Sequence, residues 1–195
     1  LDNSQKGKLG AAGAITFAAQ ELANTTGEVA AAGQLDVAVS GAVDNAQGSL
    51  LANQNLNLDA RTLDNTGGSV GAAQGHAALR TQGQTVNRGG KVLAGGALTL
   101  ANAGLDNTQG QATGSSLSVD TRAAELNNER GTLASSQGAL DIRSGALDNN
   151  AGRIQSAGDM RIDTQGQAQS NRDASALPAQ DAQGPPVRGG IGRGG

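Results

Sequence analysis

Asparagine recurs through this sequence at nearly constant intervals, and its amide is the most regular chemically capable group in the chain. An amide offers both a donor and an acceptor, so amides stacked in a column can bond to one another. They could also form a ligand-binding face, but the even intervals favour a structural column that stabilises turns. The predicted turn ladder consists of Asn3, Asn24, Asn45, Asn65, Asn107, Asn128 and Asn149.

An acidic residue precedes most of these asparagines. Carboxylates stacked ~4.8 Å apart would repel one another. A divalent cation could bridge Asp44 and Asp64, but such cations take six to eight oxygen ligands and no glycine-aspartate calcium motif is present. We therefore predict no metal site, and expect the carboxylates to accept hydrogen bonds from nearby turn amides. The set is Asp2, Asp44, Asp64, Asp106 and Asp148, interrupted by Ala23 and Asn127.

The remaining candidate groups do not assemble into a catalytic motif. His76 is the only histidine and the chain has no cysteine, which disfavours metal binding and acid–base catalysis. "GGKVLAGG" (89–96) lacks the Gly-Lys-Ser/Thr ending of a phosphate loop. An enzyme of the pectin-lyase type would need clustered acids and long insertions that form a cleft, and the largest departures here are one or two residues. We predict no catalytic residue, no cofactor and no enzymatic activity.

The elements that position these residues are repeats. In "LDNNAGRIQSAGDMRID" (147–163), Leu-Asp-Asn is followed by a glycine, a single apolar residue and an alternating apolar pair. The same order recurs in eight units, with successive spacings of 21, 21, 20, 23, 19, 21 and 21 residues. We interpret the 23 and 19 as one slipped unit at Val86. The units open at Leu1, Leu22, Val43, Leu63, Val86, Leu105, Leu126 and Leu147.

Within each unit the apolar spacing of two residues predicts short strands. Asparagine and glycine separate these strands, and both tolerate left-handed backbone. The alanine-rich segment 11–23 resembles a helix, but the equivalent segment two units later alternates as a strand does. A short strand cannot bury its apolar face alone, whereas parallel stacking of the units at ~4.8 Å creates a continuous core.

The sequence therefore predicts an all-β fold, a single-stranded parallel β-helix of about eight coils of 20–21 residues, over residues 1–168. The alternative, a leucine-rich repeat, needs a denser leucine pattern and a helical back. Residues 169–195 contain all three prolines and little periodicity, which predicts a flexible tail or linker. The absence of an initiator methionine and of a signal peptide suggests an internal segment of a longer chain.

Composition limits the partners. The net charge is −3, the 14 basic residues are scattered, and Phe17 is the only aromatic residue, so nothing indicates nucleic-acid binding. No apolar run is long enough to span a membrane. The absence of cysteine is compatible with a secreted chain that crosses a pore unfolded.

The repeated phrase LDN-x-x-G-x-I-x-S-x-G-x-L-x-L resembles the haemagglutinin repeat of filamentous haemagglutinins and of the stalks of contact-dependent growth inhibition proteins. Both are two-partner-secretion exoproteins, and the resemblance covers residues 1 to about 168. It implies a right-handed β-helix that is secreted or displayed on the bacterial surface after export through an outer-membrane β-barrel transporter.

The same resemblance implies a stiff fibre that takes part in cell attachment through a receptor on a host or neighbouring cell. The alternatives are a stalk that delivers a toxin, or a module that binds a host receptor or glycan along its side.

Overall fold

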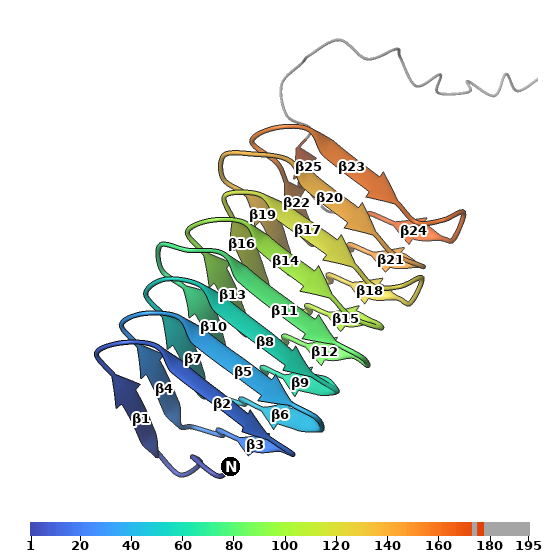
Figure 1. Cartoon of the computed structure of the whole chain (residues 1–195). Coiled ribbons are helices and arrows are strands. Elements are labelled where there is room, and N and C mark those ends of the chain that lie inside the picture. Colours follow the sequence, from blue (N-terminus) through green and yellow to red (C-terminus); the bar gives the residue numbers. More distant parts are fainter. Residues whose placement is uncertain (173–174, 178–195) are drawn as a thin grey trace, which may run out of the picture.

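The computed structural model describes residues 1–172 and 175–177, and over this range the chain is a stack of coils (Figure 1). Each complete coil contributes one strand to each of three parallel sheets, and each strand pairs with its counterpart in the next coil. Coils 1 to 8 denote the successive strand triplets, from β1–β3 to β22–β24. The predicted all-β solenoid of about eight coils is thus confirmed, and the described residues contain no helix of the kind a leucine-rich repeat needs.

The strands are two to five residues long. The first sheet contains β1 (Lys8–Ala11), β4 (Glu28–Ala31), β7 (Ser49–Ala52), β10 (Ser69–Ala72), β13 (Lys91–Ala94), β16 (Gln111–Gly114), β19 (Thr132–Ser135), β22 (Arg153–Gln155) and β25 (Ser175–Leu177). The second contains β2 (Ile15–Ala19), β5 (Leu35–Val39), β8 (Leu56–Ala60), β11 (Ala77–Thr81), β14 (Leu98–Ala101), β17 (Leu117–Asp120), β20 (Leu140–Arg143) and β23 (Met160–Asp163). The third contains β3 (Leu22–Ala23), β6 (Ala42–Asp44), β9 (Thr62–Asp64), β12 (Thr85–Val86), β15 (Leu105–Asp106), β18 (Leu126–Asn127), β21 (Leu147–Asp148) and β24 (Gln169–Ser170).

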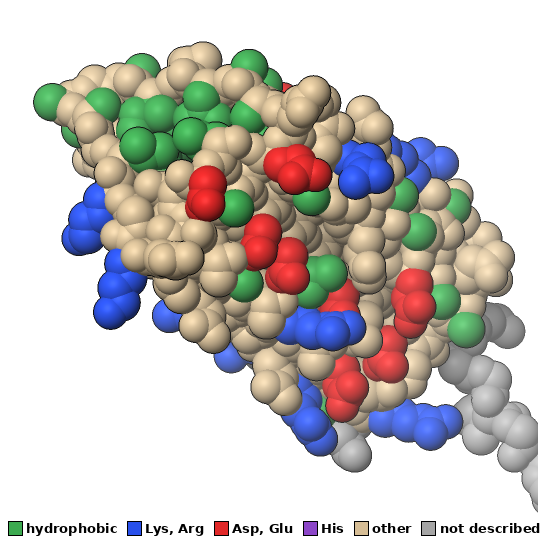
Figure 2. Space-filling model, turned by 90° about the horizontal axis from the view of Figure 1, so that it is seen from below, with side chains coloured by type: hydrophobic (Ala, Val, Ile, Leu, Met, Phe, Trp, Pro, Cys, Tyr) green, Lys and Arg blue, Asp and Glu red, His purple; other side chains and the backbone are tan. Residues whose placement is uncertain are grey.

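The core is a narrow column of leucine, valine, isoleucine and alanine inside the stack. Leu56 and Leu58 of β8 are both fully buried, and their counterparts in the coils on either side stack directly on them. At the ends of the stack, Phe17 and Met160 are only partly buried, because a coil covers them on one side alone. Hydrophobic side chains accordingly gather at the end away from the grey residues in Figure 2.

The register of coil 4 differs from the prediction. Thr85, not Val86, pairs with Leu63 and Leu105, and it is buried at the position that a leucine or valine holds in the other coils. Val86 instead takes the outward position of Asp64 and Asp106. The unit is therefore not slipped there: a threonine substitutes for the opening apolar residue, and a valine substitutes for the aspartate.

Residues beyond the predicted array boundary at 168 still pair with the stack. Gln169 and Ser170 form β24, and residues 175–177 form β25 against β22. Within the predicted tail, residues 173–174 and 178–195 lie outside the described residues.

Candidate functional site

The asparagines lie one above another in a buried column between the third and first sheets. Each Nδ2 donates to the Oδ1 of the asparagine in the next coil; from Asn45 to Asn65, for example, the distance is 2.7 Å. Asn87 and Asn171 also belong to the column, although the predicted ladder omitted them. The full column is Asn3, Asn24, Asn45, Asn65, Asn87, Asn107, Asn128, Asn149 and Asn171.

From Asn24 to Asn128, each amide also donates to two backbone oxygens, one in its own turn and one in the next coil. The Nδ2 of Asn45 lies 3.3 Å from the backbone oxygen of Gly48 in its own turn, and 3.2 Å from that of Ser69 in the next coil. The backbone oxygen of Asn45 accepts from the amide of Gly48 at 3.0 Å. The amide hydrogens are therefore used inside the rod, which argues against a ligand-binding amide face and supports a structural role.

From Asn24 to Asn149, the glycine three residues after each asparagine of the column is required by close packing between coils. A Cβ on Gly48 would lie 2.1 Å from the backbone oxygen of Asn24, a distance that no side chain can tolerate. The same approach, at 2.1–2.2 Å from the preceding asparagine oxygen, occurs at Gly27, Gly68, Gly90, Gly110, Gly131 and Gly152. These glycines do not have positive φ angles, so close packing and not left-handed backbone accounts for them.

The residue in left-handed backbone is instead the one immediately before the glycine. Its φ is 54° at Gln47, 59° at Thr26 and 53° at Arg130, so most coils place a side chain in a conformation that glycine prefers. Gly67 and Gly89 occupy this position in two coils, with φ of 62° and 58°. The asparagine bonds on both sides of the turn hold this conformation.

The acidic residues cap the same turn. The Oδ1 of Asp44 accepts from the amide of Ala46 at 3.0 Å, and where Asn127 replaces aspartate its Oδ1 accepts from Glu129 in the same way. The other carboxylates that cap the amide two residues later are Asp2, Asp64, Asp106 and Asp148. The described residues contain no group of three or more His, Cys, Asp or Glu side chains that could hold a metal ion.

Asp106 has a partner that the sequence did not predict. In coil 4 the acidic position holds Val86. The guanidinium of Arg88, two residues later, lies 2.6 Å from the carboxylate Oδ2 of Asp106 in coil 5. Burial by itself raises the pKa of Asp106, but hydrogen bonds from Thr108 and Arg88, together with the charge of Arg88, outweigh it and leave that pKa below its ordinary value of 3.8. The hydrogen bond to Asp106 raises the pKa of Arg88 in turn.

His76 takes part in an outer corner between the first two sheets. Its backbone amide donates to the Oδ1 of Asn55 at 2.9 Å, and its Nδ1 accepts from the amide of Ala97 at 2.9 Å. The ring nitrogen nearest the backbone therefore links coils 4 and 5. This geometry gives His76 a structural partner on each side.

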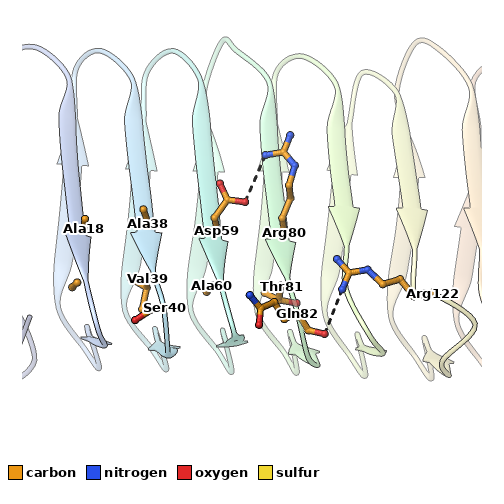
Figure 3. A pocket seen from close by; sticks show the side chains of 11 residues that line it. Ala18, Ala38, Val39, Ser40, Asp59, Ala60, Arg80, Thr81, Gln82 and Arg122 are labelled. Carbon is orange, nitrogen blue, oxygen red and sulfur yellow. Dashed lines mark hydrogen bonds and ion pairs between the residues drawn. The ribbon is translucent and has the colours of Figure 1, made fainter.

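A shallow groove runs across coils 1 to 4 beside the ends of the second-sheet strands (Figure 3). Ala18 and Ala38 lie along it, Arg80 lies 4.0 Å from Asp59, and Arg122 of coil 6 reaches back to the backbone oxygen of Gln82 at 3.4 Å. Among the residues that line the groove, Asp59 is the single carboxylate, and Arg80 faces it. Asp59 is thus paired with Arg80, and the groove-lining residues include no second carboxylate and no histidine that could act as a catalytic pair.

On the face shown in Figure 2, acidic side chains lie along the middle and basic side chains lie mostly toward the edges, without a continuous basic stripe. The described residues include no helix of the length and apolarity that crossing a membrane requires.

The haemagglutinin repeat family model matches four overlapping segments of the chain: residues 1–39, 30–89, 81–123 and 116–181. No curated protein and no solved structure matches the chain significantly. The matched segments include every member of the asparagine column, from Asn3 to Asn171.

Proposed function

Because this chain belongs to the haemagglutinin repeat family, we propose that it is a stiff structural segment of a filamentous adhesin and acts in cell attachment. The asparagine column carries the proposal, because it runs unbroken from Asn3 to Asn171 beside three continuous parallel sheets. Bending the rod would strain all of these bonds together. Each coil adds ~4.8 Å of length, so the segment converts repeat number into distance from the cell.

The family and the composition support a location outside the cell. Filamentous exoproteins of this kind are secreted or held on the bacterial surface, after export through an outer-membrane β-barrel transporter. Our proposal includes such a transporter as the partner during export, and a receptor on a host or neighbouring cell as the partner of the fibre. A chain without cysteine cannot form disulfides that would obstruct its passage through a pore. A stalk that presents a toxin would use the same rod.

The groove beside the second sheet favours a second candidate, a lateral binding module. Arg80 and Arg122 both lie along it, and Arg80 is more than half exposed. An extended polar chain such as a glycan could follow the rod and meet both guanidinium groups. This candidate requires specific outward side chains, whereas a spacer requires only that the coils stack.

Replacing Arg80 and Arg122 together by alanine separates the two candidates. The variant should be expressed by the bacterium that displays the fibre, and both the surface amount and the attachment to target cells should be measured. The spacer proposal predicts unchanged display and unchanged attachment. A loss of attachment at normal display would favour the lateral module.

A matched pair of arginines outside the groove provides the control. Arg61 and Arg153 are both exposed, and replacing both by alanine removes the same total charge. If the two double variants lose attachment equally, charge in general is responsible and the groove is not.

A further inference from the structure

One interior column of the rod changes from apolar to polar along its length. It lies where the second sheet turns toward the third, and successive members belong to successive coils through the strand register. The column reads Ala19, Val39, Ala60, Thr81, Asn102, Thr121, Ser144 and Thr164. Coils 4 to 7 therefore enclose polar side chains where coils 2 and 3 enclose apolar ones.

Most of these polar groups have partners within their own coil. The Oγ1 of Thr81 donates to the backbone oxygen of Gly83 at 2.8 Å, and that of Thr121 donates to the backbone oxygen of Ala124. Asn102 differs: it is 1% exposed, and within the described residues neither its Nδ2 nor its Oδ1 has a hydrogen-bond partner. A buried amide that is left unpaired loses the hydrogen bonds it would make with water in the unfolded chain, so this side chain needs a ligand.

The chemistry of the column identifies that ligand. Asn102 has both a donor and an acceptor to satisfy, so a cation would serve only its Oδ1 and an anion only its Nδ2. Neither Thr81 nor Thr121, its neighbours in the column, carries an ionisable group to balance a buried ion. Their hydroxyls are already donors and keep lone pairs that can accept. A small neutral molecule that both donates and accepts is required, and water has these properties.

The corner that follows Asn102 is shorter than the corresponding corners of the coils on either side. In coil 5 the corner from Asn102 to Leu105 is a three-residue step. The corresponding step is four residues in coil 4, from Thr81 to Thr85, and five in coil 6, from Thr121 to Leu126. The short corner is thus held between two longer ones. We propose that Asn102 binds a buried water molecule together with the hydroxyl of one of its two column neighbours, Thr81 of coil 4 or Thr121 of coil 6.

A crystal structure of the 195-residue chain at a resolution that shows ordered water tests this directly. The expected result is a density peak within about 2.7–3.2 Å of an Asn102 amide atom and of at least one of the two hydroxyls. In solution, the Asn102 side-chain amide should show a cross peak to slowly exchanging water. Asn45 is the internal control, because its amide is buried but fully bonded, and it should show no such peak.

Variants taken from the column itself keep the test independent of folding. Val39 and Ala60 occupy the same interior position in coils 2 and 3, so Asn102→Val and Asn102→Ala both have precedents in this rod. Asn102→Val should fold and lose the water. A dry site in the wild-type crystal, with no water cross peak at Asn102, would overturn the proposal.

Discussion

The side chains of Asn24 and Asn45 lie one above the other in neighbouring coils and share a hydrogen bond of 2.7 Å. The backbone oxygen of the same Asn24 faces Gly48, which has no space for a Cβ. A single repeated phrase therefore specifies both a bond and a contact between coils. The stability of the rod should depend on these residues more than on any outward side chain.

Replacing Asn45 by alanine should destabilise the rod strongly. The change removes the bonds to Asn65, Gly48 and Ser69, and it also removes the Oδ1 that accepts from the Nδ2 of Asn24. We expect a loss of ~2–4 kcal/mol in the free energy of unfolding. Urea unfolding followed by circular dichroism measures it. Asn53→Ala, at an exposed position of the same coil, is the control and should change stability by less than ~0.5 kcal/mol. Equal effects at the two positions would contradict a structural column.

Replacing Gly48 by alanine tests close packing between coils. The new Cβ would meet the backbone oxygen of Asn24 at 2.1 Å, so the two coils must separate locally. We expect the variant to lose more than ~2 kcal/mol of stability in thermal or urea unfolding. Gly13→Ala should be nearly neutral, because nothing lies within 4 Å of a Cβ there and its φ is not positive. A neutral Gly48→Ala would show that the glycine only serves the turn.

An aspartate at Leu58 should prevent folding, since it places a carboxylate in the core column where the leucine is fully buried. The expected loss exceeds ~4 kcal/mol. Leu51→Asp is the matched control, because Leu51 is 40% exposed on the outer face of β7. Circular dichroism should show β-structure for the second variant alone; folded spectra for both would mean that the inward and outward faces are assigned wrongly.

The Arg88–Asp106 pair predicts a dependence of stability on pH. The pKa of Asp106 is lowered in the folded chain, so the carboxylate contributes stability above its ordinary value of 3.8, and this is lost as the pH falls through the folded pKa. Arg88→Gln removes the positive charge that offsets the effect of burial on Asp106. The pKa of Asp106 should therefore rise, and the loss of stability on acidification should begin at a higher pH. Melting temperatures between pH 3 and 7 measure this shift. Arg61→Gln, at an exposed position, should retain the wild-type profile.

The coil period and the apolar ladders could be predicted from the sequence because burial dictates them. Leu56 and Leu58 alternate with outward asparagines, and any stacked arrangement must bury the leucines. Thr85 was missed because it is a polar residue at an apolar position. Its hydroxyl bonds to Thr81 of the same coil, and its register is marked by Asn87, which follows it by two residues as in the other units.

Some features of the candidate site could likewise be predicted from the sequence, and others could not. The asparagine column was predictable from spacing, since equal intervals place equal residues in register. The reason for Gly48 was not, because the oxygen it meets belongs to Asn24, one coil away. The partner of Asp106 was also hidden, because Arg88 stands 18 residues earlier in the sequence and comes near only when the coils stack.

If the segment adds length in whole coils, the distance between two spin labels must change by one coil spacing for each coil removed. The chain has no cysteine, so Ala12→Cys and Ala157→Cys provide unique labelling sites at exposed positions after β1 and β22. They are seven coils apart, which predicts a separation of about 34 Å at ~4.8 Å per coil. Deleting residues 43–62 removes one complete turn and joins Ala42 to Leu63 with the third-sheet register preserved.

We expect the distance distribution of this deletion variant to stay narrow, with its mean shortened by ~4.8 Å. Deleting only residues 53–62 removes β8 without a whole coil, and should give a broad distribution from a misfolded chain. If the distance stays unchanged in the whole-coil deletion, or its distribution is as broad as that of the ten-residue deletion, the segment does not add length in whole coils.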